Sequence, residues 1–271
     1  RRHTRYISVT GVQTCALPIF CIGSYGINSA YWVAAICSAI AGVIAIFIRV
    51  TEKQELVEAD ADSKNPFKYA LQGFVTLKSL PGLVIVFLSF TILSVIYMPT
   101  EMVVLPRYYN SIDFPEGLGF LITTMAASTV VGSLLYEYLH RKLGFANVVR
   151  IAGISIGVMM IPMSLGPDYW VMLVCGAILG FAWGPMMPLL NTLIQSMVPA
   201  NIRGRVFAIE TVMWNTAPLT SYIVVGICLD AFGVLPVYLT LGVLVLLASS
   251  AVAIAPQLKE LDRKSTRLNS S

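Results

Sequence analysis

Charged side chains are scarce in this chain. Only 12% of its 271 residues are charged, whereas 57% are hydrophobic and the mean hydropathy is +0.78. A soluble domain carries about a quarter of its residues as charges, so this composition excludes an ordinary soluble fold. The apolar residues form long runs and not the short alternating segments of an outer-membrane barrel. We therefore predict an all-α, polytopic helical membrane protein.

The sequence also lacks histidines and cysteines at the spacing of a metal site. The sequence has two histidines and five cysteines, and Cys21, Cys37, Cys175 and Cys228 are scattered through apolar runs without metal-ligand spacing. Such thiols are typical of helix cores. No paired-carboxylate, zinc-ligand or nucleophile motif stands in a suitable context, and serines and threonines inside spans usually form hydrogen bonds between helices. We predict that the protein is not an enzyme and has neither a metal site nor a cofactor.

The two ends differ from the rest of the chain. Residues 1–19 resemble translated sequencing-adapter sequence, and the segment from about 263 to 271 resembles it too. Without both segments, Lys and Arg fall from 18 to 12 against 14 Asp and Glu, so the formal charge of +4 becomes −2. The basic balance therefore does not indicate nucleic-acid binding. We expect genuine sequence from about residue 20 to 262, continuing on its N-terminal side.

Seven apolar runs reach the roughly 20 residues that cross the hydrocarbon core. The predicted spans are about 29–49, 82–104, 117–139, 147–166, 169–196, 206–230 and 233–255. In the fifth, Pro185 and Pro188 predict a kinked helix. Glycines at every fourth position of the fourth and fifth spans predict close helix packing. They are Gly153 and Gly157, and Gly176, Gly180 and Gly184.

Basic residues occupy alternate connections between the spans. One set of connections holds eleven of them, and the other holds only Arg107. The eleven are Arg49, Lys53, Lys64, Lys68, Lys78, Arg141, Lys142, Arg150, Arg203, Arg205 and Lys259. Because Lys and Arg concentrate in cytoplasmic loops, we predict that the first set faces the cytoplasm. The expected location is the inner membrane of a bacterium, crossed several times.

The longest connection follows the first predicted span. Residues 52–62 are acidic, and Asn65-Pro66 is typical of a helix start. Apolar residues share one face of 66–79, with lysines nearby, which favours an amphipathic helix lying on the membrane. A plain connector is the alternative.

The stretch Val198–Phe207, VPANIRGRVF, is predicted to form a tight basic turn between two membrane-length helices. We expect Gly204 to lie where this chain turns or packs closely, because glycine tolerates positive φ. A small residue in an ordinary helix start is the alternative.

This stretch and its flanks resemble a known family. The run before it ends WGPMMPLLN, and the run after it carries APLTSYIVVGICLDAFG. Together they resemble spans ten and eleven of the major facilitator superfamily, especially its drug-efflux branch with macrolide-efflux-like proteins. Residues 132–144, GSLLYEYLHRKLG, are similar to the family's span–basic turn–span signature, although Glu137 is displaced by one position from the usual acid. The seven spans would then be spans six to twelve.

The resemblance implies both a domain division and a function. Its segments are the adapter-like tail 1–19, the last span of an N-terminal half at 20–50, the central loop 51–81, a C-terminal six-helix half at 82–258 and a cytoplasmic tail at 259–271. The implied function is secondary active transport, with proton-coupled efflux of small amphipathic compounds by alternating access. The partners would be the lipid bilayer, an amphipathic substrate, protons and the missing N-terminal half. Without that half, we expect insertion but no transport.

Three alternatives to drug efflux stay open. The first is a facilitator of another cargo, such as a siderophore, a sugar or a lysophospholipid. The second is a membrane scaffold or receptor that transports nothing. The third is an assembled reading frame without activity.

Glu210 lies inside an apolar run, where an ionised side chain is costly. It could exchange protons or bind a cation in a cavity. It could equally pair with Arg203 or Arg205 and close the cytoplasmic side. An interfacial acid stabilised by its helix N-terminus is the third interpretation.

Two further acids lie near the ends of predicted spans. Glu101, at the outer end of the second span, is a coupling candidate or a solvated helix end. Glu137 is expected to pair with Arg141 four residues on. The candidates for proton coupling or gating are therefore Glu210, Glu101, Arg203, Arg205, Glu137 and Arg141.

Aromatic and polar residues recur at helical spacing in two predicted spans, and Tyr97 lies in a third span. Such faces could enclose a large apolar molecule fixed by few polar groups, and methionine suits loose specificity. The alternative is that the tryptophans and methionines only pack against neighbouring helices. The candidates for a substrate cavity are Tyr97, Trp183, Met187, Asn191, Trp214 and Asn215.

Overall fold

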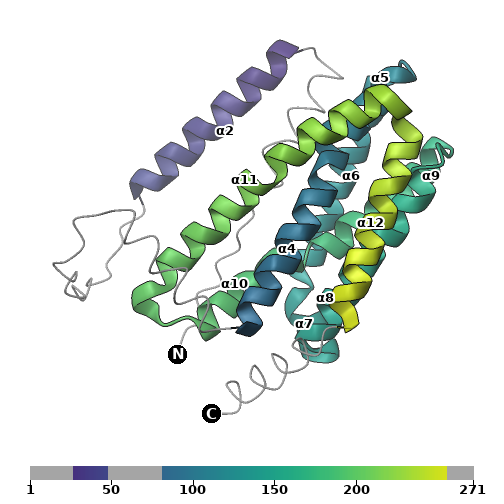
Figure 1. The fold of residues 1–271 in the computed structure, drawn as a ribbon. Helices are drawn as coiled ribbons and strands as arrows, with labels where there is room; N and C mark the ends of the chain where they lie inside the picture. The colour runs from purple at the N-terminus through teal and green to yellow at the C-terminus, as the bar shows by residue number, and fades with distance from the viewer. Residues whose placement is uncertain (1–26, 48–80, 255–271) are drawn as a thin grey trace.

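A computed structural model describes residues 27–47 and 81–254, which are almost entirely helical (Figure 1). The helices are α2 (Ile27–Phe47), α4 (Pro81–Pro99), η1 (Thr100–Val104), α5 (Leu105–Ser111), α6 (Pro115–Leu134), α7 (Tyr136–Leu143), α8 (Phe145–Met163), α9 (Tyr169–Trp183), α10 (Met186–Met197), α11 (Ala200–Phe232) and α12 (Val234–Ile254). The predicted all-α class is confirmed. The predicted surface helix at 66–79 and both adapter-like segments lie outside the described residues.

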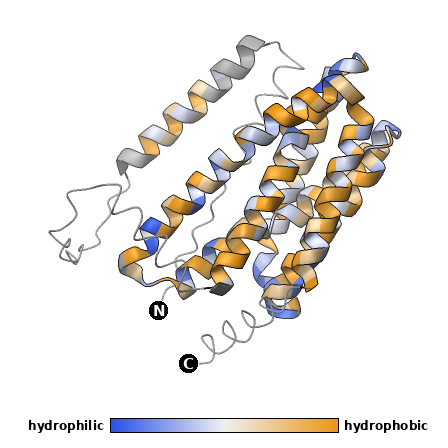
Figure 2. Ribbon diagram, in the orientation of Figure 1, coloured by the Kyte–Doolittle hydropathy of each residue, from blue (hydrophilic) through white to orange (hydrophobic). Residues whose placement is uncertain are grey.

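Six helical stretches are long and apolar enough to cross a membrane. They are Leu83–Ser111, Pro115–Leu134, Phe145–Met163, Tyr169–Met197, Ile202–Phe232 and Val234–Ile254. Figure 2 shows hydrophobic residues along the lengths of these helices and hydrophilic residues towards their ends. Six predicted spans are therefore confirmed. The first, 29–49, corresponds to α2, a 21-residue apolar helix, and its crossing of the membrane stays a prediction.

Two predicted span limits were wrong at the ends of α6 and α4. The helix predicted to reach residue 139 ends at Leu134, because the chain turns at Leu135 and the separate amphipathic helix α7 begins. The helix predicted to end at 104 continues through η1 and α5 to Ser111. Hydropathy alone did not distinguish these cases, since apolar residues border both helix ends.

The basic linker after α10 was also predicted wrongly. Only Val198 and Pro199 lie between α10 and α11, and the IRGR segment belongs to α11. Val198 is extended, with φ −100° and ψ 127°, because a residue before proline is pushed away from helical angles. Gly204 is an exposed helical residue, and a Cβ added to it would meet no heavy atom within 4 Å. The ordinary helix start is therefore correct for this glycine.

The predicted kink in the fifth span is confirmed. The chain forms α9 and then α10, with a break at Gly184 and Pro185. Proline lacks a backbone N–H and disturbs the preceding helical turn. The break lets α10 leave the direction of α9 and contact α4, α6, α8 and α11.

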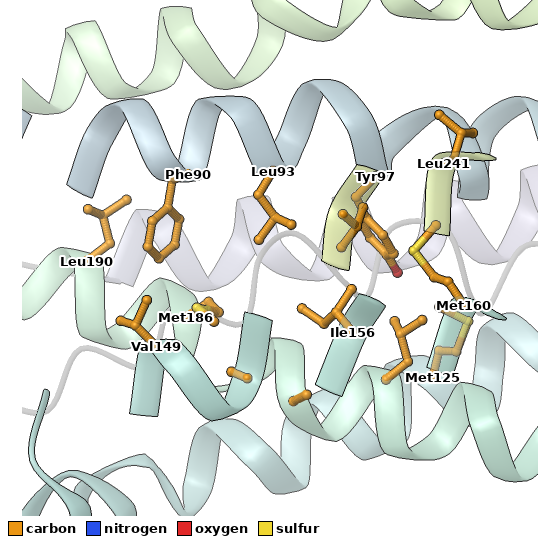
Figure 3. Close-up of a cluster of buried hydrophobic side chains, with 14 of the residues drawn as sticks. Phe90, Leu93, Tyr97, Met125, Val149, Ile156, Met160, Met186, Leu190 and Leu241 are labelled. Atoms are coloured by element: carbon orange, nitrogen blue, oxygen red, sulfur yellow. The ribbon is translucent and has the colours of Figure 1, made fainter. Parts of the chain in front are cut away.

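The membrane-length helices form a curved row in the order α6, α9, α8, α12, α4 and α11, as their contacts show (Figure 1). Buried side chains fill the inside of this row. In Figure 3, Phe90, Leu93 and Tyr97 extend from α4 towards Val149 and Ile156 on α8. The face of α4 that carries these residues also carries the candidate site described below.

Glycines hold two pairs of neighbouring helices together, as predicted from their spacing. A Cβ added to Gly180 would lie 2.2 Å from the carbonyl oxygen of Met125 on α6, and one at Gly157 would lie 2.7 Å from Leu246 Cα on α12. The close approach also allows Thr129 on α6 to donate a hydrogen bond to the Gly180 carbonyl, at 2.9 Å. Both small-residue patterns therefore serve packing.

The helix directions place the two basic connections at one end of the bundle. The segments 141–150 and 200–205 lie at the lower end in Figure 1, and α5 with Arg107 lies at the upper end. The lower end is the one predicted to face the cytoplasm.

We expect a membrane-impermeant maleimide applied to intact cells to miss cysteines introduced as Lys142→Cys or Gly204→Cys in a cysteine-free background. Asn110→Cys, exposed at the opposite end, should label and serves as the control. Ready labelling of either of the first two variants in intact cells would reverse the predicted orientation.

Candidate functional site

The candidate site begins where α4 changes to a π-helical turn. Pro106 has no N–H to donate to the carbonyl four residues earlier, and residues 100–104 adopt the wider η1 turn just before it. Such turns are rare and frequently mark functional sites. Glu101 lies in this turn, and the hydroxyl of Tyr97 donates a hydrogen bond to Glu101 Oε1.

Three aromatic rings extend the site across three helices. Tyr97 on α4 stacks on Trp183 of α9, with ring centroids 4.9 Å apart and an interplanar angle of 28°. Trp183 meets Trp214 of α11 edge to face, at 6.0 Å and 90°. Tyr97 is only 1% exposed, whereas both tryptophans and Glu101 are partly exposed. We call Tyr97, Glu101, Trp183 and Trp214 the aromatic–carboxyl cluster.

Two more tyrosines surround the carboxyl group. Tyr222 on α11 and Tyr238 on α12 lie close enough to Glu101 to interact with it electrostatically. Tyr238 is buried and donates a hydrogen bond to Met163 Sδ at 3.5 Å. Tyrosines from α4, α11 and α12 therefore lie within electrostatic reach of one acid.

Two buried hydroxyl groups lie near Tyr97 in sequence, Ser94 on α4 and Thr100 at the start of η1. Ser94 and Thr100 are 0% and 1% exposed, and neither hydroxyl has a hydrogen-bond partner among the described residues. Elsewhere on α4, Ser89 and Thr91 donate to the carbonyl four residues earlier. Buried hydroxyls are normally paired, so Ser94 and Thr100 are exceptions among the described residues.

Glu210 lies apart from the two arginines that were candidates to pair with it. In the described part of the chain it forms no ion pair with Arg203 or Arg205, and its side chain is partly exposed on α11. Arg203 instead donates hydrogen bonds to the carbonyls of Gln195 at 2.8 Å and Val198 at 3.2 Å. It therefore caps the end of α10 and fixes the α10–α11 connection.

The expected pairing of Glu137 with Arg141 is confirmed. Arg141 Nη2 lies 2.6 Å from Glu137 Oε1, and both side chains are exposed on α7. An exposed i, i+4 pair of this kind stabilises its own helix modestly. The pair lies on α7, which contributes no residue to the aromatic–carboxyl cluster.

Three cavity candidates are not joined to the cluster. Asn215 is exposed and donates a hydrogen bond to the Thr211 carbonyl of its own helix, at 2.7 Å. Met187 and Asn191 are partly exposed on α10, and no described ring contact or hydrogen bond links them to the three rings. The structure therefore brings together Tyr97, Trp183 and Trp214 from that set, and adds Glu101 from the acidic set.

Sequence reasoning missed four residues around Glu101. Ser94 and Thr100 follow the helical spacing of Tyr97, so that spacing could have found them. Tyr222 and Tyr238 come from α11 and α12, and nothing local in the sequence connects them with Glu101. A small crevice elsewhere, between α4, α8, α10 and α12, contains none of the candidates. It is lined by Ser89, Phe90, Leu93, Val149, Gly153, Met186, Ala248, Ser249 and Val252.

Comparison with known proteins shows the family of this chain. The model of the Major Facilitator Superfamily matches residues 9–218 and 103–269. The multidrug efflux pump Tap of Mycolicibacterium fortuitum is 31% identical over 167 residues, which are 62% of this chain and 41% of that protein. Macrolide efflux protein A of Streptococcus pyogenes is 20% identical over 265 residues, 95% of this chain and 64% of that protein.

A third relative is the multidrug resistance protein MdtG of Escherichia coli, 26% identical over 139 residues, 51% of this chain and 33% of that protein. The chain thus spans roughly a third to two thirds of the length of these curated relatives. Their names describe efflux pumps and a resistance protein, and none describes an enzyme. With six membrane-length helices and a family model that covers most of the sequence, the chain belongs to the Major Facilitator Superfamily of membrane transporters.

Proposed function

We propose that this protein takes part in the proton-coupled efflux of small amphipathic compounds across the inner membrane of a bacterium. The observation that carries the proposal is the convergence of Tyr97, Glu101, Trp183 and Trp214 from three helices. The names of the relatives, which include two kinds of efflux pump and a resistance protein, support the same function.

The rings provide the apolar part of the substrate site. Tyr97, Trp183 and Trp214 form a continuous row of rings, in which both tryptophans are partly exposed and Tyr97 is buried. Flat rings hold apolar molecules of different shapes, and their faces attract cations. With a carboxyl group at one end, this surface suits amphipathic molecules that carry a positive charge.

Glu101 provides the proton site in this mechanism. When it is ionised, it attracts a cationic substrate and accepts the hydrogen bond from Tyr97. When it binds a proton, its negative charge disappears and the substrate loses that attraction. A proton and a cationic substrate therefore compete for one side chain, which is the requirement for exchanging one against the other.

Glu210 is assigned a second role. It lies in the first third of α11, near the end of the bundle that carries Arg203 and Arg205. Because it forms no ion pair with them in the described part of the chain, we assign it to the entrance for cations at the cytoplasmic end. The cap that Arg203 makes on α10 keeps this entrance fixed between α10 and α11.

The experiment measures binding of rhodamine 6G to the purified chain in nanodiscs as a function of pH. We expect the affinity of the unchanged protein to fall as the pH is lowered, because protons displace the dye. Glu101→Gln should bind about tenfold more weakly at neutral pH, and its affinity should not vary with pH.

Glu210→Gln is the matched control, since it removes an acid from another helix. It should keep the pH dependence of the unchanged protein. If Glu101→Gln retains that dependence and Glu210→Gln loses it, the proton site is at Glu210 and the assignment to Glu101 is wrong.

A further inference from the structure

Helix α7 lies between two membrane-crossing helices. It occupies eight residues, Tyr136–Leu143, after the turn at Leu135 and before Gly144, whose φ of 78° reverses the chain into α8. Because α6 and α8 both cross the membrane, this helix lies at the membrane surface at their shared end (Figure 1). Its surroundings are therefore phospholipid headgroups as well as water.

One face of α7 packs inwards and leaves the other face exposed. Tyr136, Leu139 and Leu143 pack against the core at spacings of three and four residues. Burial raises the pKa of Tyr136, and its hydroxyl interacts with Thr192 of α10. The inner face is thus anchored to the bundle, and α7 presents a fixed outer face to the membrane surface.

The outer face and the start of α8 carry an excess of positive charge. The last turn of α7 holds His140, Arg141 and Lys142, and Arg150 follows on α8. Glu137 is the only acidic residue between 134 and 150, and it pairs with Arg141. We call Arg141, Lys142, Asn147 and Arg150 the basic corner.

Hydrogen bonds hold Arg150 beside the end of α7. Its Nη1 donates to Asn147 Oδ1 at 3.2 Å, and Asn147 Nδ2 donates to the Leu143 carbonyl at 2.9 Å. The Nε of Arg150 is buried and has no partner among the described residues. The first turn of α8 has no side-chain cap either. Hydrogen-bond donors and positive charge therefore lie together at the junction of α7 and α8. The described side chains offer no further acceptor for the Arg150 Nε.

Exposed apolar side chains continue this surface. Leu134 is 65% exposed and Tyr138 is 60% exposed, and Lys142 Nζ lies 5.8 Å from the centre of the Tyr138 ring. A ligand that contacts both the basic corner and these apolar side chains needs an anionic, oxygen-rich group attached to an apolar body. A soluble phosphate compound would leave Leu134 and Tyr138 in water.

From this charge complementarity and the place of α7, we propose that the basic corner binds the phosphate headgroup of an anionic phospholipid. The phosphate oxygens accept hydrogen bonds from Arg150 and Lys142, and the acyl chains lie against Leu134 and Tyr138. Such a lipid neutralises neighbouring cations and ties α7 to α8. The site is separate from the aromatic–carboxyl cluster and does not depend on the transport proposal.

The test compares the full chain in nanodiscs of phosphatidylcholine alone and of phosphatidylcholine mixed with phosphatidylglycerol. We expect phosphatidylglycerol to raise the Tm of the unchanged protein by several degrees. We also expect native mass spectrometry to retain bound phosphatidylglycerol. The double variant Lys142→Gln, Arg150→Gln should lose the Tm increase and bind phosphatidylglycerol about tenfold more weakly.

Arg107→Gln is the matched control, because it removes one positive charge at the opposite end of the bundle, where Arg107 pairs with Asp230. It should keep the full lipid effect, and Lys142→Arg should keep it too. An equal lipid effect in the double variant would overturn the proposal. Displacement of phosphatidylglycerol by soluble glycerol phosphate would overturn the assignment to a lipid.

Discussion

Replacing Gly180 with valine is expected to prevent α6 and α9 from packing, and to leave little folded protein. A Cβ at this position would lie 2.2 Å from the Met125 carbonyl oxygen and 2.8 Å from Met125 Cα. Both are backbone atoms, so neither can move aside as the end of a flexible side chain would. Separating the helices also removes the hydrogen bond from Thr129 to the Gly180 carbonyl. We expect a destabilisation of about 3 kcal/mol or more.

Gly226→Val is the matched control for this prediction. Gly226 also lies in a membrane-length helix, but a Cβ added to it would meet nothing within 4 Å. The measurement is the yield of monodisperse protein in mild detergent, together with its Tm. Equal yields and equal Tm values for the two variants would show that α6 and α9 do not approach each other as described.

Replacing Trp183 with alanine is expected to remove most of the binding of amphipathic cations. Trp183 contacts both other rings, since Tyr97 stacks on it and Trp214 meets it edge to face. Its loss therefore breaks two aromatic pairs and removes one ring face from the substrate. Together these effects amount to about 2–3 kcal/mol, roughly a hundredfold in affinity.

The control is Trp170→Ala, on the same helix. Trp170 is 76% exposed and lies at the start of α9, so it is expected to leave dye binding unchanged. Trp183→Phe keeps an aromatic ring and should restore most of the affinity. The contradicting result is that Trp183→Ala binds the dye as tightly as the unchanged protein and Trp170→Ala binds it more weakly. Dye binding would then have to be assigned to another surface.

The sequence allowed the helices to be predicted better than their ends. A run of 20 apolar residues has one stable solution in a bilayer, which is a helix with all its backbone groups paired. Proline and glycine predicted the break between α9 and α10 and the contacts of Gly180. The end of α6 at Leu134 was missed, because apolar Leu135 follows directly and Tyr136, Tyr138 and Leu139 extend the run of large hydrophobic residues. The start of α11 was missed because its first turns are polar but still helical.

Part of the candidate site could also be predicted. Trp183 and Trp214 were predicted because they recur with polar residues at helical spacing, and Tyr97 because it lies within a predicted span. The contact of Tyr97 with Glu101 depends on the π-helical turn, and no local pattern shows which way that turn directs the Glu101 side chain. Asn215 was included for its polarity and its approximate helical spacing from Glu210, and its hydrogen bond to Thr211 satisfies it within α11. Which side chains meet at the site depends on how the different helices pack, and a local sequence pattern does not show that packing.

The most direct test of the proposed site is photolabelling of the purified chain with a diazirine derivative of a lipophilic cation, followed by peptide mapping. The same labelling is repeated with an excess of the unmodified cation, which competes for the specific site. If the aromatic–carboxyl cluster is the substrate site, the competed labels will lie on the peptides that carry Tyr97 and Glu101, Trp183 and Trp214. Competed labelling confined to other segments, such as the crevice residues Ser89 and Ser249, would contradict this location.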